Sequence, residues 1–199
     1  MASQTQHSGT RQRLIAAMHD LLQRKGFHGV GINDVLALAQ APKGVMYHHF
    51  PGGKVELAVA AIQSAVENII ARLEQLQTSS QYTLQSLNIW MDHALKRLAK
   101  SGYERGCPLA AVALESTADD HLLRRTLNEG FCRIRSVLAE MLVDAGLTAE
   151  RAGRFATLIV SAYEGALLQS RVADSVGPAG ETLEMLMELI QVEINRKPT

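Results

Sequence analysis

Residues 31–57 read GINDVLALAQAPKGVMYHHFPGGKVEL and predict two short helices followed by the start of a third. Apolar residues recur at helical spacing over 32–39, and the pattern breaks at Gln40–Ala41. Pro42 is expected to open the second helix at its first position, where the missing N–H costs nothing, and Pro51-Gly52-Gly53 ends that helix. Two short helices joined by a turn of three or four residues are typical of a helix-turn-helix, whose second helix enters the major groove of DNA.

The second of these helices has one inward edge and one face suited to DNA. At about 100° per residue, Met46 and Phe50 fall on the same edge and are expected to point inward. The other positions offer hydrogen-bond donors, a bare backbone and one compact apolar side chain. They are Lys43, Gly44, Val45, Tyr47, His48 and His49. Such groups can reach phosphates, guanine or a thymine methyl. A surface helix that carries them incidentally is the alternative.

The composition indicates a globular chain with an uneven charge distribution. Of 199 residues, 47% are hydrophobic and 20% charged, enough to bury a sizeable core. The formal net charge is zero, but residues 1–55 hold six Lys and Arg against two acids, and the remainder holds fourteen against eighteen. The N-terminal quarter therefore carries modest positive potential. No apolar run approaches the ~18 residues needed to cross a membrane, and the start lacks a signal-peptide core, so we expect a cytoplasmic protein without membrane contact.

Helical periodicity continues along the chain, and no segment reads as a strand. The first helix is expected from Thr10 to Lys25, after polar residues 1–9, and braces the two short helices. Six further helices are expected after Gly53. Their ranges are Lys54–Leu76, Tyr82–Lys100, Pro108–Ser116, Asp119 or Asp120 to Ala145, Thr148–Asp174 and Glu181–Asn195. The prediction is an all-α protein of about nine helices, with a three-helix head over 1–53 and a helical ligand-binding and dimerisation bundle over 54–199.

The first 57 residues match a known family pattern at Ile32, Asp34, Val35, Lys43, Gly44, Tyr47, His49, Phe50, Lys54, Glu56 and Leu57. With these residues the chain resembles the TetR family of transcriptional regulators. The doubled glycine Gly52-Gly53, the segment GCPLAA at 106–111 with Leu114-Glu115, and EGAL at 164–167 are similar to the LmrA/YxaF-like branch of that family. The resemblance thus covers nearly the whole chain.

Two positions depart from the family pattern. Gln40 stands where the turn often has glycine, and Gly31 stands where a capping threonine is common. These departures bear on the geometry of the turn and on one phosphate contact.

The resemblance implies a homodimer, joined through its last two helices as a four-helix bundle, that represses transcription from an inverted-repeat operator in double-stranded DNA. The last helix is apolar over so wide an arc that it needs partners on two sides, and we infer that one is a second copy of the chain. Paired recognition helices must lie about 34–36 Å apart. A small-molecule effector that prefers a wider arrangement would lower the affinity for DNA.

The resemblance also assigns residues to sites. Lys43, Gly44, Val45 and His48 would face base edges, Tyr47, His49 and Lys54 would hold phosphates, and Asn33 is a weaker phosphate candidate. An aromatic or amphipathic effector would suit a group of aromatic, histidine and methionine side chains on otherwise apolar helices. They are Trp90, Met91, His93, Tyr103, Phe131 and Tyr163. Packing in the core is the alternative role for each. The dimer interface is expected at Phe155, Ile159, Ala162, Ala166, Leu186 and Ile190.

No enzyme motif, metal site or cofactor site is expected. Adjacent His48 and His49 do not converge on a metal, and Gly53-Lys54 lacks the other elements of a phosphate loop. Cys107 stands at a helix start, where a thiolate is favoured, so a redox switch is a lesser alternative. Two other functions stay open: a small-molecule-binding helical dimer without DNA recognition, and a helical-bundle enzyme. The enzyme would need Glu-x-x-His pairs on facing helices, and we find none.

Overall fold

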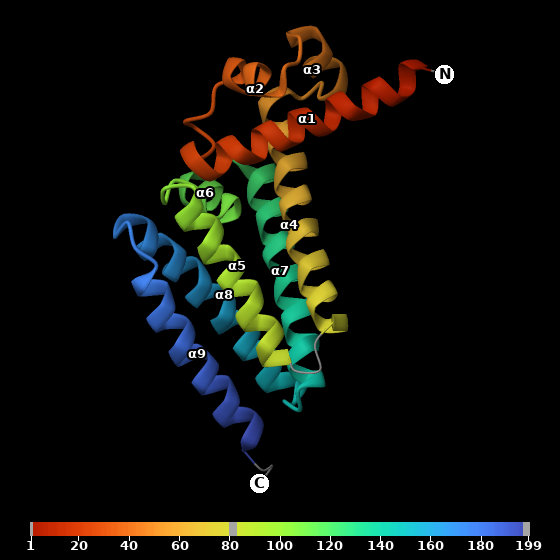
Figure 1. Cartoon of the computed structure of the whole chain (residues 1–199). Helices are drawn as coiled ribbons and strands as arrows, with labels where there is room; N and C mark the ends of the chain where they lie inside the picture. The colour runs from red at the N-terminus through yellow and green to blue at the C-terminus, as the bar shows by residue number, and fades with distance from the viewer. Residues whose placement is uncertain (1, 80–82, 197–199) are drawn as a thin grey trace. The chain divides into compact units, whose positions relative to one another are not determined.

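The computed structural model describes residues 2–79 and 83–196, and within these ranges all regular structure is helical (Figure 1). The helices are α1 (Ala2–Lys25), α2 (Ile32–Ala39), α3 (Lys43–His49), α4 (Gly53–Ser79), α5 (Thr83–Lys100), α6 (Pro108–Glu115), α7 (His121–Asp144), α8 (Ala149–Val172) and α9 (Gly177–Asn195). The prediction of an all-α fold is confirmed. None of the described helices is long and apolar enough to cross a bilayer.

Several helix boundaries differ from the sequence-based prediction. The fourth helix ends at Ser79 rather than Leu76, because Gln77 and Thr78 are polar but do not stop a helix, and other ends differ by one or two residues. The first helix begins at Ala2 rather than Thr10, because the preceding segment contains no proline and nothing in it stops a helix. The last helix begins at Gly177 rather than Glu181, since Pro178 stands in its first turn, where proline is favoured. The third helix begins at Lys43, and Pro42 is its extended N-cap. The expected start of α5 at Tyr82 lies outside the described residues.

The chain divides into two compact units, each built from separate parts of the sequence. The first unit comprises residues 1–66 and 107–130, so it holds α1, α2, α3, the beginning of α4, α6 and the start of α7. The second comprises residues 67–106 and 131–199, with the remainder of α4 and α7 and all of α5, α8 and α9. The division into domains over 1–53 and 54–199 stays a prediction.

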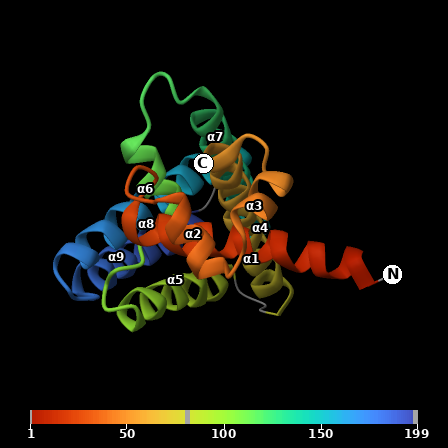
Figure 2. The ribbon, with the colours of Figure 1, turned by 90° about the horizontal axis from the view of Figure 1, so that it is seen from above.

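In the first unit, α2 and α3 lie along α1 (Figure 2). The fully buried side chains come from all the helices of this unit that lie before residue 66, together with α6. The largest of them are Leu14, Met18, Leu22, Met46, Phe50, Leu57, Ile62 and Leu109. Arg13 Nε of α1 donates a hydrogen bond of 3.0 Å to the carbonyl of Ala39, one of the α2 carbonyls that the helix itself leaves unsatisfied. This bond fixes the end of α2 against α1.

In the second unit, α5, α8 and α9 pack side by side (Figure 1). Thr148 caps α8 by accepting a hydrogen bond from the backbone N–H of Arg151. The Arg151 side chain in turn donates a hydrogen bond of 2.6 Å from Nε to Glu193 Oε1 of α9. This charge-assisted bond ties the N-terminal end of α8 to the C-terminal end of α9.

Candidate nucleic-acid interface

The turn between α2 and α3 is closed by a left-handed residue. Gln40 has φ 51° and ψ 47°, its N–H bonds to the carbonyl of Ala37, and the N–H of Ala41 bonds to the carbonyl of Leu36. This pair of bonds is the Schellman arrangement, which satisfies the last carbonyls of a helix and usually has glycine at the left-handed position. The glutamine therefore adopts the backbone conformation that the family's glycine would adopt.

Replacing Gln40 by glycine is expected to stabilise the protein by about 0.5–1 kcal/mol. A left-handed backbone costs an L-residue about 1–2 kcal/mol, and the larger chain entropy of glycine offsets part of that gain. Ala37→Gly, on an exposed helical position of the same helix, is the matched control and should destabilise by about 1 kcal/mol. Denaturant unfolding measures both, and a lower midpoint for Gln40→Gly would contradict the strain argument.

The α3 helix presents two different faces. Met46 and Phe50 are 0% and 1% exposed, so the predicted inward edge is confirmed. The outward residues divide by accessibility: Lys43, Gly44, Tyr47 and His48 are exposed, whereas Val45 and His49 are half-buried. A patch with a lysine, a bare backbone, a tyrosine and a histidine on one short helix can meet both phosphates and base edges.

No contact within the described structure requires glycine at position 44. A Cβ atom at this position would meet nothing within 4 Å in the described residues, and glycine inside a helix costs about 0.5–1 kcal/mol relative to alanine. The absence of a side chain therefore lets another molecule approach the α3 backbone closely, as a duplex in contact with this helix would.

Tyr47 is 45% exposed and its ring lies beside the glycine that begins α4. A Cβ atom on Gly53 would lie 3.6 Å from Tyr47 Cε1, and Gly53 has φ +68°. A side chain would therefore fit against the ring, and the requirement for glycine at position 53 comes from its left-handed backbone, which turns the chain into α4.

The remaining DNA-contact candidates differ in accessibility. Asn33 is exposed in the first turn of α2, next to Gly31, which is an extended N-cap without a side-chain hydrogen bond. The His49 ring makes edge contacts with His48 and Phe50 at centroid distances of 5.4 and 6.5 Å. Lys54 is half-buried, and its Nζ lies 4.3 Å from the centroid of the Phe27 ring.

The structure brings together two of the six predicted effector contacts. The rings of Trp90 and Tyr163 stack with centroids 4.6 Å apart at 27°, and Tyr163 is hydrogen-bonded to Arg97. Burial lowers the pKa of that guanidinium, and Tyr163 opposes the shift. Met91 is fully buried in the core of the second unit. Of the other three candidates, Tyr103 and Phe131 are half-buried and His93 is exposed.

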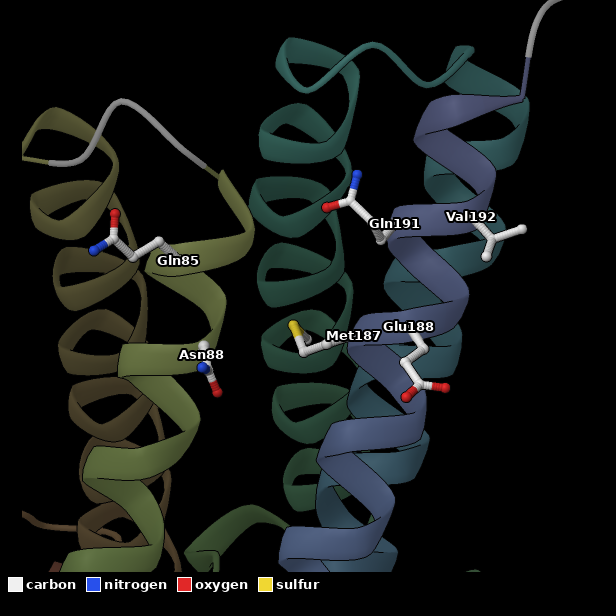
Figure 3. Close-up of a pocket in the computed structure, with 6 residues that line it drawn as sticks. All are labelled: Gln85, Asn88, Met187, Glu188, Gln191 and Val192. Carbon is white, nitrogen blue, oxygen red and sulfur yellow. The ribbon is translucent and has the colours of Figure 1, made fainter.

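A groove that sequence reasoning missed runs between α5 and α9 (Figure 3). It has a volume of about 650 Å³ and is lined by Gln85, Asn88, Met187, Glu188, Gln191 and Val192. The sequence signal is weak: two amide side chains lie three residues apart on α5, Gln85 and Asn88, and such pairs are common on solvated surfaces. The groove is open to solvent and shares no residue with the six predicted effector contacts.

The six residues predicted to form the dimer interface differ in how deeply they are buried within the subunit. Ile159, Ala166, Leu186 and Ile190 are buried inside the second unit, so they are part of its own core. Phe155 and Ala162 are half-buried. Six other apolar residues of α8 and α9 are between 42% and 80% exposed and are called the exposed α8–α9 residues below. They are Leu158, Leu168, Val172, Met185, Leu189 and Val192.

The arrangement of α2, the turn and α3 in the first unit defines a helix-turn-helix regulator. Residues 14–61 match the family model described as bacterial regulatory proteins, tetR family, and residues 83–181 match transcriptional regulator LmrA/YxaF-like, C-terminal domain. The chain belongs to the TetR family of bacterial transcriptional regulators and carries its DNA-binding domain. Both family models describe transcriptional regulators rather than enzymes.

Individual relatives match over almost the full chain. An uncharacterized HTH-type transcriptional regulator of Mycobacterium tuberculosis is 30% identical over 94% of this chain and 96% of its own length. The HTH-type transcriptional repressor NemR of Escherichia coli is 24% identical over 96% of this chain and 98% of its own length. Among solved structures, the regulatory protein TetR from Rhodobacter sphaeroides has a TM-score of 0.80 and 25% identity, covering 89% of this chain and 96% of that chain. These matches agree with the architecture described above.

Proposed function

We propose that the protein is a homodimeric repressor that binds an inverted-repeat operator and is released by a small aromatic or amphipathic effector. It acts in the cytoplasm, where the chromosomal DNA lies. The observation that carries this proposal is the exposed face of α3, with Lys43, Tyr47 and His48 around the bare backbone of Gly44. The name of the relative NemR, a transcriptional repressor, supports repression.

The roles of the DNA-contacting residues follow from their chemistry and accessibility. Lys43, Gly44, Val45 and His48 face base edges, and Tyr47 contacts a phosphate. Asn33 adds a phosphate contact from α2. His49 and Lys54 are phosphate candidates whose side chains pack against neighbouring rings in the described conformation.

Homodimerisation is supported by the exposed α8–α9 residues. Six of the thirteen exposed large apolar side chains among the described residues lie on α8 and α9, which pack against each other, and apolar surface gathered in one region is typical of protein interfaces. Half-buried Phe155 and Ala162 border them on α8, whereas the four buried residues of the predicted interface support it from within the subunit. A two-fold dimer places two copies of α3 on successive major grooves.

The effector proposal is supported by the aromatic pair in the second unit. The stacked rings of Trp90 and Tyr163, with Arg97 at the tyrosine oxygen, combine apolar area with a hydrogen-bonding group. Such a combination suits a flat aromatic ligand with a polar substituent. An effector that binds one arrangement of the dimer more tightly shifts the population towards it, so release requires no contact between the effector and DNA.

The decisive experiment is a selection from a pool of random duplexes with the purified full-length protein at moderate salt. Enrichment of an inverted repeat whose half-sites lie about one helical turn apart is the expected result. Analytical ultracentrifugation of the same sample should show a dimer. A monomer at micromolar concentration, or failure to enrich any palindrome, would contradict the proposal and favour the alternative of a helical protein without DNA recognition.

Tyr47→Phe is expected to weaken binding to the selected operator and to a scrambled duplex alike, by about 1 kcal/mol for each half-site. The change removes one hydroxyl from an exposed side chain, and a phosphate contact carries no sequence information. Tyr103→Phe, the same change in the second unit, is the matched control and should leave both affinities unchanged. Fluorescence anisotropy titrations provide the measurement, and a loss confined to the operator would refute the assignment to phosphate.

A further inference from the structure

One arginine continues the apolar stripe of α1 beyond the core of the first unit. Leu14, Ile15 and Met18 are buried on one face of this helix, and they follow Arg11 by three, four and seven residues. Residues at these spacings share a helix face, so Arg11 belongs to the same face one turn earlier. Unlike those three it is exposed, because it lies where the stripe leaves the core.

The guanidinium of Arg11 lies at the end of α3, a helix that α1 passes in the first unit (Figure 1). Its Cζ atom is 5.2 Å from the centroid of the Phe50 ring. Phe50 is the C-cap of α3 and is only 1% exposed, so the arginine covers a ring that is otherwise inside the unit. A cation over a ring is attracted to its face, and the N–H donors around the guanidinium stay available to a further partner.

The acids of the N-terminal quarter do not neutralise Arg11. Asp20 pairs with Arg24 at a distance of 3.1 Å. Asp34 pairs with Lys25 at the same distance. The N-terminal quarter has no other acid, and none of the described residues forms an ion pair with Arg11. This permanent positive charge is therefore available to a partner outside the subunit.

We propose that Arg11 binds a phosphate of the DNA backbone beside the C-terminal end of α3. The inference rests on the proposed DNA binding and adds a contact from α1, outside the helix-turn-helix. Lys43 begins α3 and Arg11 lies at its other end, and a helix of seven residues is about 10 Å long. The major groove is about 12 Å wide and has a phosphate strand on each side, so a cation at the end of a helix in this groove can reach one strand.

The chemistry of the side chain suits this role. A guanidinium offers parallel N–H donors that match two oxygens of a phosphate, and such charge-assisted pairs are strong. The contact with the Phe50 ring holds the group at the end of α3 before DNA binds, so less side-chain freedom is lost on binding.

The test uses Arg11→Met, which keeps an unbranched side chain over the Phe50 ring and removes the charge. Each subunit should lose one phosphate contact, so the slope of log affinity against log salt becomes shallower by about 0.9 per subunit, or about 1.8 for the dimer. The loss of affinity relative to the wild type is then about tenfold larger at about 50 mM salt than at about 200 mM. Anisotropy titrations provide the measurement. The change should appear on both the selected operator and a scrambled duplex, because a phosphate contact carries no sequence information.

Three further variants make the test specific. Arg11→Gln should lower the slope as Arg11→Met does, and Arg11→Lys, which keeps the charge, should retain the wild-type slope. Arg133→Gln removes an exposed arginine of α7 in the second unit and should leave the slope unchanged. The proposal is overturned by an unchanged slope in the two uncharged variants, or by an equal decrease in Arg133→Gln. A slope that falls as far in Arg11→Lys as in Arg11→Met also overturns it.

A purely structural role for Arg11 gives a different result. If the guanidinium only covers the Phe50 ring, its removal lowers the urea midpoint of unfolding and leaves the salt slope unchanged, and the proposal fails. Because Arg11 is exposed, we expect all three of its variants to fold. If the wild-type protein binds no selected duplex, the proposed DNA-binding function fails and this inference fails with it. That result is distinct from a wild type that binds with a slope indifferent to Arg11.

Discussion

Leu189→Glu is expected to convert the dimer to a monomer and to lower its affinity for the operator by more than about 100-fold. Leu189 is 47% exposed on α9, between Met185 at 55% and Val192 at 67%. A carboxylate at this position would have to enter an apolar interface without a partner, at a cost of several kcal/mol in each of two symmetric contacts. A monomer retains one recognition helix and loses the gain from binding two half-sites together, which is about 10²–10⁴.

The subunit itself should tolerate this change, because the leucine is exposed and not part of the buried core. Val143→Glu is the matched control: Val143 is 43% exposed on α7 in the same unit and is not one of the exposed α8–α9 residues. The control should remain dimeric and bind the operator like the wild type. Sedimentation velocity gives the oligomeric state and anisotropy gives the affinity. A Leu189→Glu protein that stays dimeric would place the interface elsewhere.

Local signals were sufficient to predict the helices around the turn. The expected helix over 32–39 is the α2 of the structure, because its apolar spacing and the break at Gln40 are both encoded within ten residues. The inward edge of α3 followed from the angular separation of Met46 and Phe50 alone. Boundaries in polar segments were harder, since nothing before Thr10 either favours or stops a helix strongly.

The depth of apolar residues on α9 could not be predicted in the same way. Leu186 and Leu189 are both leucines on a helix that is apolar over a wide arc, yet one is 3% exposed and the other 47%. Periodicity shows that such a helix has two partners, but it does not show which arc faces the subunit's own core. That choice depends on where α5 and α8 pack, which is information from distant parts of the chain.

The contacts of the Lys54 side chain could not be predicted from the sequence either, because they also come from distant parts of the chain. Its ammonium lies on Phe27, a residue of a connector rather than of a periodic helix, and near Glu115, 61 positions later in the chain. The family resemblance assigns the lysine to a phosphate, and no local pattern indicates that its ammonium lies on this ring. The contact between α1 and α6 brings Glu115 to the α1–α2 connector, and Lys54 reaches the same connector from α4.

Lys43→Ala is expected to cost about 1–3 kcal/mol for each half-site, and therefore about 2–6 kcal/mol for the dimer on its operator. Lys43 is the exposed first residue of α3, the position from which a recognition helix first meets the groove. If its ammonium binds a guanine edge, the loss should be concentrated on one base pair of each half-site, and changing that base pair should weaken the wild type but not the variant. If it binds a phosphate instead, the loss of affinity should be uniform across sequences, and the slope of log affinity against log salt should fall by about 0.9 per subunit.

The control for net charge is Lys96→Ala, which removes an exposed lysine of the second unit. An operator affinity unchanged by Lys43→Ala would mean that α3 does not face DNA, because no other charged side chain of this helix is permanently positive.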